Sequence, residues 1–170
     1  KAVSTILTQV TVDPYDESSY TPMKVVGRVM NAEEAKEEEA KGNFIVKEGE
    51  GYRRIVAAPK PVAIVEIDAI RALADADQPV IAAGGGGIPV MEQGSHLKGA
   101  SAVIEKDRAA GLLAKELDAD VLMFITGVPN VVLNYGSDHP INIDKMTTAD
   151  AARYAGEGHF KTGSMLPKVE

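Results

Sequence analysis

Residues 79–87, "PVIAAGGGG", join a short apolar run to four consecutive glycines. The run lacks polar alternation, which is typical of a parallel strand covered on both faces. Glycines behind such a strand allow several successive backbone N–H groups to turn toward one point, and such a nest binds phosphate or another anion. A flexible turn is the alternative interpretation, since the spacing fits neither the dinucleotide-binding fingerprint nor the P-loop. Both interpretations predict a loop at the carboxyl end of a strand.

The chain from residue 62 onward alternates helical and strand patterns. This order predicts an α/β domain with a largely parallel sheet, in which ligands bind beyond the carboxyl ends of the strands. "GGGGIP" and "TGVPN" both lie at such ends. The helical patterns cover residues 65–77, residues 106–120 and a short segment that Thr148 caps and that ends at Gly156 or Gly158, and the buried strands cover residues 79–83 and 121–128.

The first 60 residues follow a different pattern and predict a small excursion from the main sheet. Residues 3–12 alternate polar and β-branched side chains, which indicates a strand. Residues 13–31 are rich in turn formers and are predicted to be mostly irregular. Asn31 then caps a charged helix over residues 32–41. Two short strands around a glycine-rich turn are expected in residues 43–61.

Composition limits the classes of protein to which the chain can belong. Its 170 residues fit one domain, and no apolar run approaches the roughly 18 residues that span a bilayer, so we expect no membrane protein. The 18 Lys and Arg residues against 25 Asp and Glu residues give a net charge of −7, which disfavours a nucleic-acid partner. The sequence has no cysteine and no signal-peptide pattern, so a cytoplasmic setting is expected.

Two short motifs place lysines where a phosphate group could be held. "EKDRAAG" sets Lys106 beside Asp107 at the start of a helix, so the carboxylate meets the positive helix end. "GSMLPKVE" sets Lys168 behind Met165, which could touch an adenine ring while the lysine reaches a phosphate. Taken singly, each motif also fits an interpretation without a functional role. The first could be an exposed charged helix cap, and the second could be an ordinary turn before a helix.

Four more cations lie in the irregular first part of this acidic chain: Lys24, Arg53, Arg54 and Lys60. Most such side chains are solvated, and we expect at least two of these four side chains to be solvated. Phosphoryl transfer needs mainly positive charge and alignment, because negative charge spreads over the oxygens of the moving group. Lysines from separate loops can meet that need.

Several motifs occur together in the order and spacing of the carbamate kinases, which are members of the amino acid kinase family. They are "PVIAAGGGGIPV", "AVIEKDRAAGLLAKELDADVLMFITGVPNVVLNYG" and "GEGHFKTGSMLPKVE", with "ILTQVTVDPYD", "TPMK" and "GYRRIVAAPKP" upstream. The resemblance covers essentially all 170 residues. It implies one domain, a three-layer α/β/α sandwich with a mainly parallel sheet, made of a nucleotide-binding part at 62–170 and a protruding, substrate-covering subdomain at 13–61. Family members also carry an N-terminal Gly-Gly-Asn loop and a C-terminal strand and helix, so we expect the chain to be part of a longer protein.

The resemblance implies a reversible phosphoryl transfer between carbamoyl phosphate and ADP that yields ATP and carbamate. It implies that Lys106 and Lys168 hold phosphate oxygens, that Asp107 orients these lysines, and that Lys24 reaches over the substrate from the protruding subdomain. A carbamate oxygen is already anionic, so this reaction needs no general base, unlike transfer to a hydroxyl group.

The resemblance also implies the nucleotide contacts and the partners. Adenine would lie near Tyr135 and Met165, and ATP or ADP would bind with magnesium, which is held by phosphates and water and has no assigned protein ligand. A Cβ in the glycine loop would collide with substrate or phosphate, so the loop is expected to line the floor of the cleft with Gly84, Gly85, Gly86 and Gly87. Family members are usually homodimers, which makes a homodimer the expectation here.

The three histidines, His96, His139 and His159, are expected to be surface or packing residues, because none has the spacing of a metal site. The sequence departs from the family pattern at two places near the substrate-covering subdomain. "KVVGRVMN" stands where the family has Lys-Pro-Ile-Gly-Pro-Phe-Tyr, and Ala57 and Ala58 replace Pro-Ser. These departures leave open a related kinase for another small carboxylate. A non-catalytic binding module is a further alternative, although the joint presence of Lys106, Asp107 and Lys168 argues against it.

Overall fold

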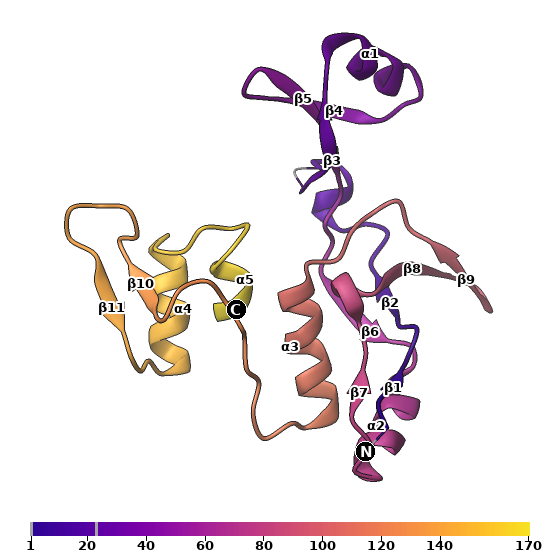
Figure 1. The fold of residues 1–170 in the computed structure, drawn as a ribbon. Coiled ribbons are helices and arrows are strands. Elements are labelled where there is room, and N and C mark those ends of the chain that lie inside the picture. The colour runs from indigo at the N-terminus through magenta and orange to yellow at the C-terminus, as the bar shows by residue number, and fades with distance from the viewer. Residues whose placement is uncertain (1, 23) are drawn as a thin grey trace. The chain divides into compact units, whose positions relative to one another are not determined.

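The computed structural model of the chain describes residues 2–22 and 24–170. It divides into two compact units, Lys1–Leu117 and Asp118–Glu170 (Figure 1). The proposed boundary between a protruding subdomain and a nucleotide-binding part, at residues 61 and 62, falls inside the first unit and stays a prediction.

The first unit is built on a four-stranded sheet with a mixed pairing pattern. β2 runs parallel to β8, whereas β6 and β9 pair antiparallel at the two edges. A second, two-stranded sheet pairs β1 with β7 in parallel. The strands are β6 (Pro61–Ile64), β2 (Gln9–Val12), β8 (Ile88–Gln93) and β9 (His96–Gly99) in the four-stranded sheet, and β1 (Ser4–Thr5) and β7 (Val80–Ile81) in the other.

The core of this unit forms where the helices α2 (Ile67–Asp75) and α3 (Lys106–Leu117) join the strands. α3 contacts both α2 and β6 (Figure 1). The apolar side chains of these elements pack against one another and exclude water. Burial of this apolar surface is the main stabilising contribution to such a unit. The buried cluster consists of Val10, Val12, Ile64, Ile70, Ile104 and Ala109. Both helices were predicted from the sequence; the prediction for α2 was two residues longer at each end, and that for α3 had the correct start and an end three residues too late.

The predicted single strand over residues 3–12 is interrupted, because the buried Thr8 turns its side chain to the backbone. Thr8 Oγ1 donates to the carbonyl of Ile6 at 2.9 Å and accepts from the Ala83 N–H at 2.8 Å. The Thr8 carbonyl accepts from the Ile88 N–H at 2.8 Å. β1 therefore pairs with β7, and β2 pairs with β8 after the break.

A three-stranded antiparallel sheet with the order β3-β5-β4 follows in the same unit. Its strands are β3 (Lys24–Met30), β5 (Gly51–Val56) and β4 (Phe44–Glu48). The β4–β5 pair with its glycine turn is confirmed. The expectation of a mostly irregular segment over residues 13–31 is wrong, since it holds β3 and a 3-10 turn at Glu17–Ser19. β3 forms because β5 supplies a partner from a segment more than 20 residues away.

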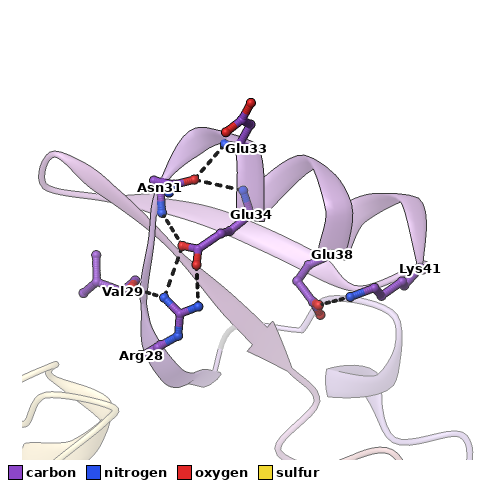
Figure 2. A network of polar contacts seen from close by, with 7 residues as sticks. All are labelled: Arg28, Val29, Asn31, Glu33, Glu34, Glu38 and Lys41. Carbon is purple, nitrogen blue, oxygen red and sulfur yellow. Dashed lines mark hydrogen bonds and ion pairs between the residues drawn. The ribbon is translucent and has the colours of Figure 1, made fainter.

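The charged helix α1 (Ala32–Ala40) begins at Asn31, as predicted. Asn31 Oδ1 accepts from the N–H groups of Glu33 and Glu34, and Glu34 Oε2 accepts from the Asn31 N–H at 3.0 Å (Figure 2). This reciprocal capping box satisfies backbone donors that the helix itself cannot pair. Arg28 from β3 forms a bidentate ion pair with the Glu34 carboxylate, which ties the helix start to the sheet.

The second unit contains an antiparallel pair, β10 (Val131–Leu133) with β11 (Ile141–Ile143), and the helices α4 (Thr148–Gly156) and α5 (Leu166–Val169). The short helix predicted to end at Gly156 or Gly158 is confirmed as α4. The predicted cap is off by one residue: Thr147, not Thr148, accepts from the Asp150 N–H in a second capping box. α4 ends at Gly156, and Gly158 adopts a left-handed conformation with φ +78° just beyond it.

Two predicted buried strands differ from the structure. Residues 121–128 form no strand, and most of their apolar side chains are exposed, with Ile125 92% exposed. The strand pairings within residues 2–22 and 24–170 do not include this segment, so its backbone groups have no ladder partner there. The strand at residues 79–83 shortens to β7, which pairs only with β1 within the described residues, and Ile81 is 56% exposed. None of the helices within residues 2–22 and 24–170 combines the length and the apolar character needed to cross a membrane.

Candidate active site

A pocket of about 310 Å³ lies inside the second unit. One wall comes from residues 126–130 and β10, and the other comes from α5 and the loop that leads into it. Its lining residues are Thr126, Val128, Asn130, Val132, Tyr135, His159, Phe160, Lys161, Ser164, Met165 and Lys168. Three residues that the sequence assigned to nucleotide binding, Tyr135, Met165 and Lys168, therefore share one pocket.

The pocket combines apolar surface with two cations. Tyr135 and Met165 offer a ring face and a thioether, which suit a flat heterocycle. Lys161 Nζ lies 5.6 Å from the centre of the Tyr135 ring. Lys168 Nζ contacts the Ser164 carbonyl at 3.4 Å and lies 5.7 Å from the centre of the Phe124 ring. An aromatic and apolar floor beside two ammonium groups is chemically suited to a base with attached phosphates.

Lys161 is a pocket residue that was not predicted from the sequence. The signal was present in "GHFKTG", where a lysine stands between two glycines in a loop before Met165. His159 lines the same pocket, with Nε2 3.2 Å from Glu157 Oε2 and its ring edge-on to Tyr154 at 5.7 Å. These contacts fit the packing role expected for His159.

The glycine loop in the first unit is crowded by the protein itself at two of its four positions. The left-handed Ala83, with φ +52°, leads into the 3-10 turn Gly84–Gly86. A Cβ on Gly86 would overlap the Ile104 carbonyl, and one on Gly87 would lie 2.5 Å from Val10 Cγ2. Gly86 and Gly87 also have positive φ values, +112° and +86°.

Gly84 and Gly85 would carry a Cβ into open space. At Gly86 and Gly87 a Cβ would therefore clash with the protein itself, which explains these two glycines without a ligand. The role of the loop as the floor of a cleft stays a prediction. The turn contacts α3, the helix that begins with Lys106.

The start of α3 gathers charged residues. Asp107 is buried in the first turn, and its Oδ2 lies 3.4 Å from Lys106 Nζ, whose side chain is largely exposed. A carboxylate at this position is favoured by the positive end of the helix. Lys24 Nζ, at the start of β3, lies 2.5 Å from Glu105 Oε2, directly before α3. Lys24, Lys106 and Asp107, three of the predicted catalytic residues, therefore belong to one region of the first unit.

The four cations singled out in the first 60 residues are less exposed to solvent than expected. Of Lys24, Arg53, Arg54 and Lys60, only Lys60 is exposed. Arg53 pairs with Glu48 at 3.2 Å. The Nε atoms of Arg53 and Arg54 are buried without a hydrogen-bond partner within the described residues. The pairing of β5 between β3 and β4 explains this burial, because neighbouring strands cover the base of each side chain.

A family model for the amino acid kinase family matches residues 23–170 of the chain. The chain belongs to the amino acid kinase family. A carbamate kinase-like protein of Escherichia coli is 49% identical over 172 residues, and the carbamate kinase of Clostridium perfringens is 46% identical over 172 residues. Both alignments cover 100% of this chain and 55% of the relative, so the chain spans about half the length of these curated relatives.

Similar solved structures confirm the α/β fold. A crystal structure from Aeropyrum pernix matches with a TM-score of 0.92 at 40% identity, over 99% of this chain and 55% of that one. A carbamate kinase from Giardia lamblia bound to AMP-PNP matches with a TM-score of 0.89 at 38% identity, over 97% of this chain and 53% of that one.

Proposed function

We propose that the protein is a carbamate kinase, which transfers a phosphoryl group between carbamoyl phosphate and ADP. The observation that carries the proposal is the pocket of the second unit, where Tyr135, Met165 and Lys168 line one cavity. The family membership and the AMP-PNP bound to the carbamate kinase of Giardia lamblia support a nucleotide as the ligand of this pocket.

In this proposal the second unit binds the nucleotide. The ring face of Tyr135 and the side chain of Met165 contact adenine, and Lys168 neutralises phosphate oxygens. A fixed ammonium group is effective here because the protein arranges the charge before the reaction begins. Lys161, which lies over the Tyr135 ring, supplies a second positive charge at the same pocket.

The first unit contributes the acceptor side of the reaction. Lys106 stabilises charge on the transferred group, and the buried Asp107 carboxylate holds the Lys106 ammonium, whose Nζ lies 3.4 Å from it. Lys24 contacts the substrate from β3. Asp107 orients and does not act as a base, because the carbamate oxygen that receives the phosphoryl group is already an anion.

Magnesium is proposed to bind together with the nucleotide. No group of three or more acidic or histidine side chains suited to a metal ion occurs in the described part of the chain. We propose that phosphate oxygens and water hold the ion, a common mode for Mg²⁺ with nucleotides. When bound, the ion supplies further neutralisation of phosphate charge. We further propose a homodimer in the cytoplasm, with the dimer resting on the family resemblance alone.

A second candidate is a kinase of the same family that acts on another small carboxylate. It is favoured by the segment after Lys24, "VVGRVM", which belongs to β3, pairs Val25 with Ile55 and Val26 with Arg54, and has a register shift between Val26 and Met30. The family pattern has prolines in this segment, and a proline cannot donate to a strand ladder. The difference lies beside Lys24, so it would act on the substrate more than on the nucleotide.

Measurement of ATP formation by the full-length protein separates the candidates. With ADP and magnesium, carbamoyl phosphate should give ATP, whereas acetyl phosphate should give far less. A preference for another acyl phosphate would select the second candidate. ADP binding by calorimetry, without any activity toward acyl phosphates, would select a binding module. Absence of ADP binding as well would contradict the assignment of the pocket.

A further inference from the structure

Lys24 and Glu105 form a close ion pair between two elements that are 81 positions apart in the sequence. Lys24 Nζ lies 2.5 Å from Glu105 Oε2, and the Glu105 side chain is only 15% exposed. Glu105 directly precedes α3, and its carbonyl accepts from the Ala109 N–H at 3.0 Å. The carboxylate that holds Lys24 is thus fixed to the helix start that carries Lys106 and Asp107.

The backbone around this pair brings the three-stranded sheet to the start of α3. In the β3–β5 ladder, Lys24 lies opposite Val56. The next residue, Ala57, forms a parallel bridge with Ala102, and the Val103 N–H donates to the Ala57 carbonyl at 3.0 Å. The backbone therefore sets where β3 begins, and the ion pair sets where the Lys24 ammonium lies.

We propose that Glu105 is a positioning residue that holds the Lys24 ammonium beside the first turn of α3. The inference rests on the proposed function, in which Lys24 contacts the substrate. A lysine side chain has four rotatable carbon–carbon bonds and a strongly hydrated head group, so an unpaired ammonium samples many positions. The Glu105 carboxylate restricts these positions before substrate arrives and leaves two of the three ammonium hydrogens to donate to an anionic substrate.

A mutant cycle in the full-length enzyme tests whether Glu105 acts through Lys24. Glu105→Gln removes the charge and keeps the side-chain shape, and it should lower kcat/KM for carbamoyl phosphate about tenfold or more. The KM for ADP should stay within about twofold, because the nucleotide pocket is in the other unit. In a Lys24→Met background, Glu105→Gln should add less than about a twofold loss, since the residue it positions is gone.

Two further variants separate positioning from a structural effect. Glu105→Asp keeps the charge and should recover part of the lost kcat/KM. Glu48→Gln removes a comparable carboxylate that is 49% exposed and pairs with Arg53, and it should leave kcat/KM unchanged. Losses that multiply in the double mutant, or a fully active Glu105→Gln enzyme, would overturn the inference.

A second readout does not depend on activity and so distinguishes failure of this inference from failure of the proposed function. Trace acetylation followed by peptide mass spectrometry reports how readily each lysine reacts. An ammonium held against a carboxylate must leave that contact before its nitrogen can react. Glu105→Gln should raise the rate at Lys24 relative to the exposed Lys47 by about threefold, the size expected for loss of a partly exposed ion pair, and Glu48→Gln should not. An unchanged ratio would overturn the inference even in an inactive protein.

Discussion

The backbone carbonyl of Ile104 faces Gly86 so closely that a methyl group on Gly86 would overlap it. Gly86 is buried in the turn behind β7, and Ile104 belongs to the buried core just before α3. This contact joins the glycine loop to the segment that carries Glu105, Lys106 and Asp107. The loop is therefore part of the framework that sets the start of α3.

Gly86→Ala should destabilise the first unit by about 3 kcal/mol or more, since the new Cβ meets backbone and the residue has a positive φ. Gly84→Ala is the matched control, because a Cβ there enters open space and φ is not in the left-handed region. It should cost less than about 1 kcal/mol. Urea unfolding of the two variants measures the difference. Equal losses would contradict the packing seen around Gly86.

Thr8→Val should cost about 1 to 3 kcal/mol, because it leaves the Ala83 N–H without its acceptor in a largely buried setting. Thr11→Val is the control. Thr11 is also buried, but its hydroxyl makes one long bond of 3.4 Å to the Ala63 carbonyl, so its loss should be smaller. Hydrogen exchange at Ala83 should accelerate only in the Thr8 variant. Slow exchange there would show that Thr8 does not hold the loop.

Glu34 provides a pH prediction for the α1 cap. The hydrogen bonds from Arg28, and then that from the Asn31 N–H, lower the pKa of Glu34 from 4.5 to about 2. A carboxyl group whose folded pKa is depressed adds stability above its unfolded pKa and loses it as pH falls. The cap should therefore be fully formed above about pH 4.5 and weaken between about pH 4.5 and pH 2.

NMR titration of the Glu34 side-chain carboxyl carbon measures this pKa directly. Arg28→Gln should move the midpoint upward toward 4.5, because the first of the two causes is removed. Lys41→Gln, which removes the partner of Glu38 on the same helix, should leave the Glu34 midpoint in place. The Arg28 side chain is exposed and Glu34 is only half-buried, so added salt should reduce the shift in the pKa of Glu34. A midpoint near 4.5 in the unsubstituted protein would contradict the ion pair.

Tyr135→Ala should weaken ADP binding about tenfold if the ring stacks on adenine, which is within the range measured for loss of one base–aromatic contact. Tyr15→Ala is the control, since Tyr15 is a similarly exposed tyrosine in the other unit. Calorimetric titration with ADP gives both values. A similar loss in the two variants, or none in Tyr135→Ala, would remove adenine from this part of the pocket.

Local signals in the sequence predicted those elements whose ends are set by their own residues. Asn31 and Glu34 form the capping box of α1. These residues are close in the sequence, so the start of the helix can be predicted without knowledge of the residues that pack around it. Of the pocket residues, Met165 and Lys168 were singled out in the motif "GSMLPKVE", and Tyr135 was found through the resemblance to a family. Lys161 lay within one of the motifs that carry this resemblance and was passed over, because a lysine in a loop is most often solvated.

Features that depend on partners distant in the sequence were predicted less well. β3 forms by pairing with β5, which is distant in the sequence. The turn-forming residues upstream of Lys24 therefore led to the wrong prediction of an irregular segment. The apolar segment at residues 121–128 has the composition of a strand, but a strand forms only beside another one. The crowding of Gly86 by Ile104 joins residues 18 positions apart, and no local pattern reports such a contact.

The most direct test of the proposed function is ATP formation from ADP, magnesium and carbamoyl phosphate by the full-length protein and its Lys168→Ala variant. Lys145→Ala serves as the control, because Lys145 is an exposed lysine outside the pocket. We predict robust activity that falls about a hundredfold or more in Lys168→Ala, as expected when a preorganised charge is removed from a phosphoryl-transfer site. Equal activity of the Lys168 and Lys145 variants would contradict the account.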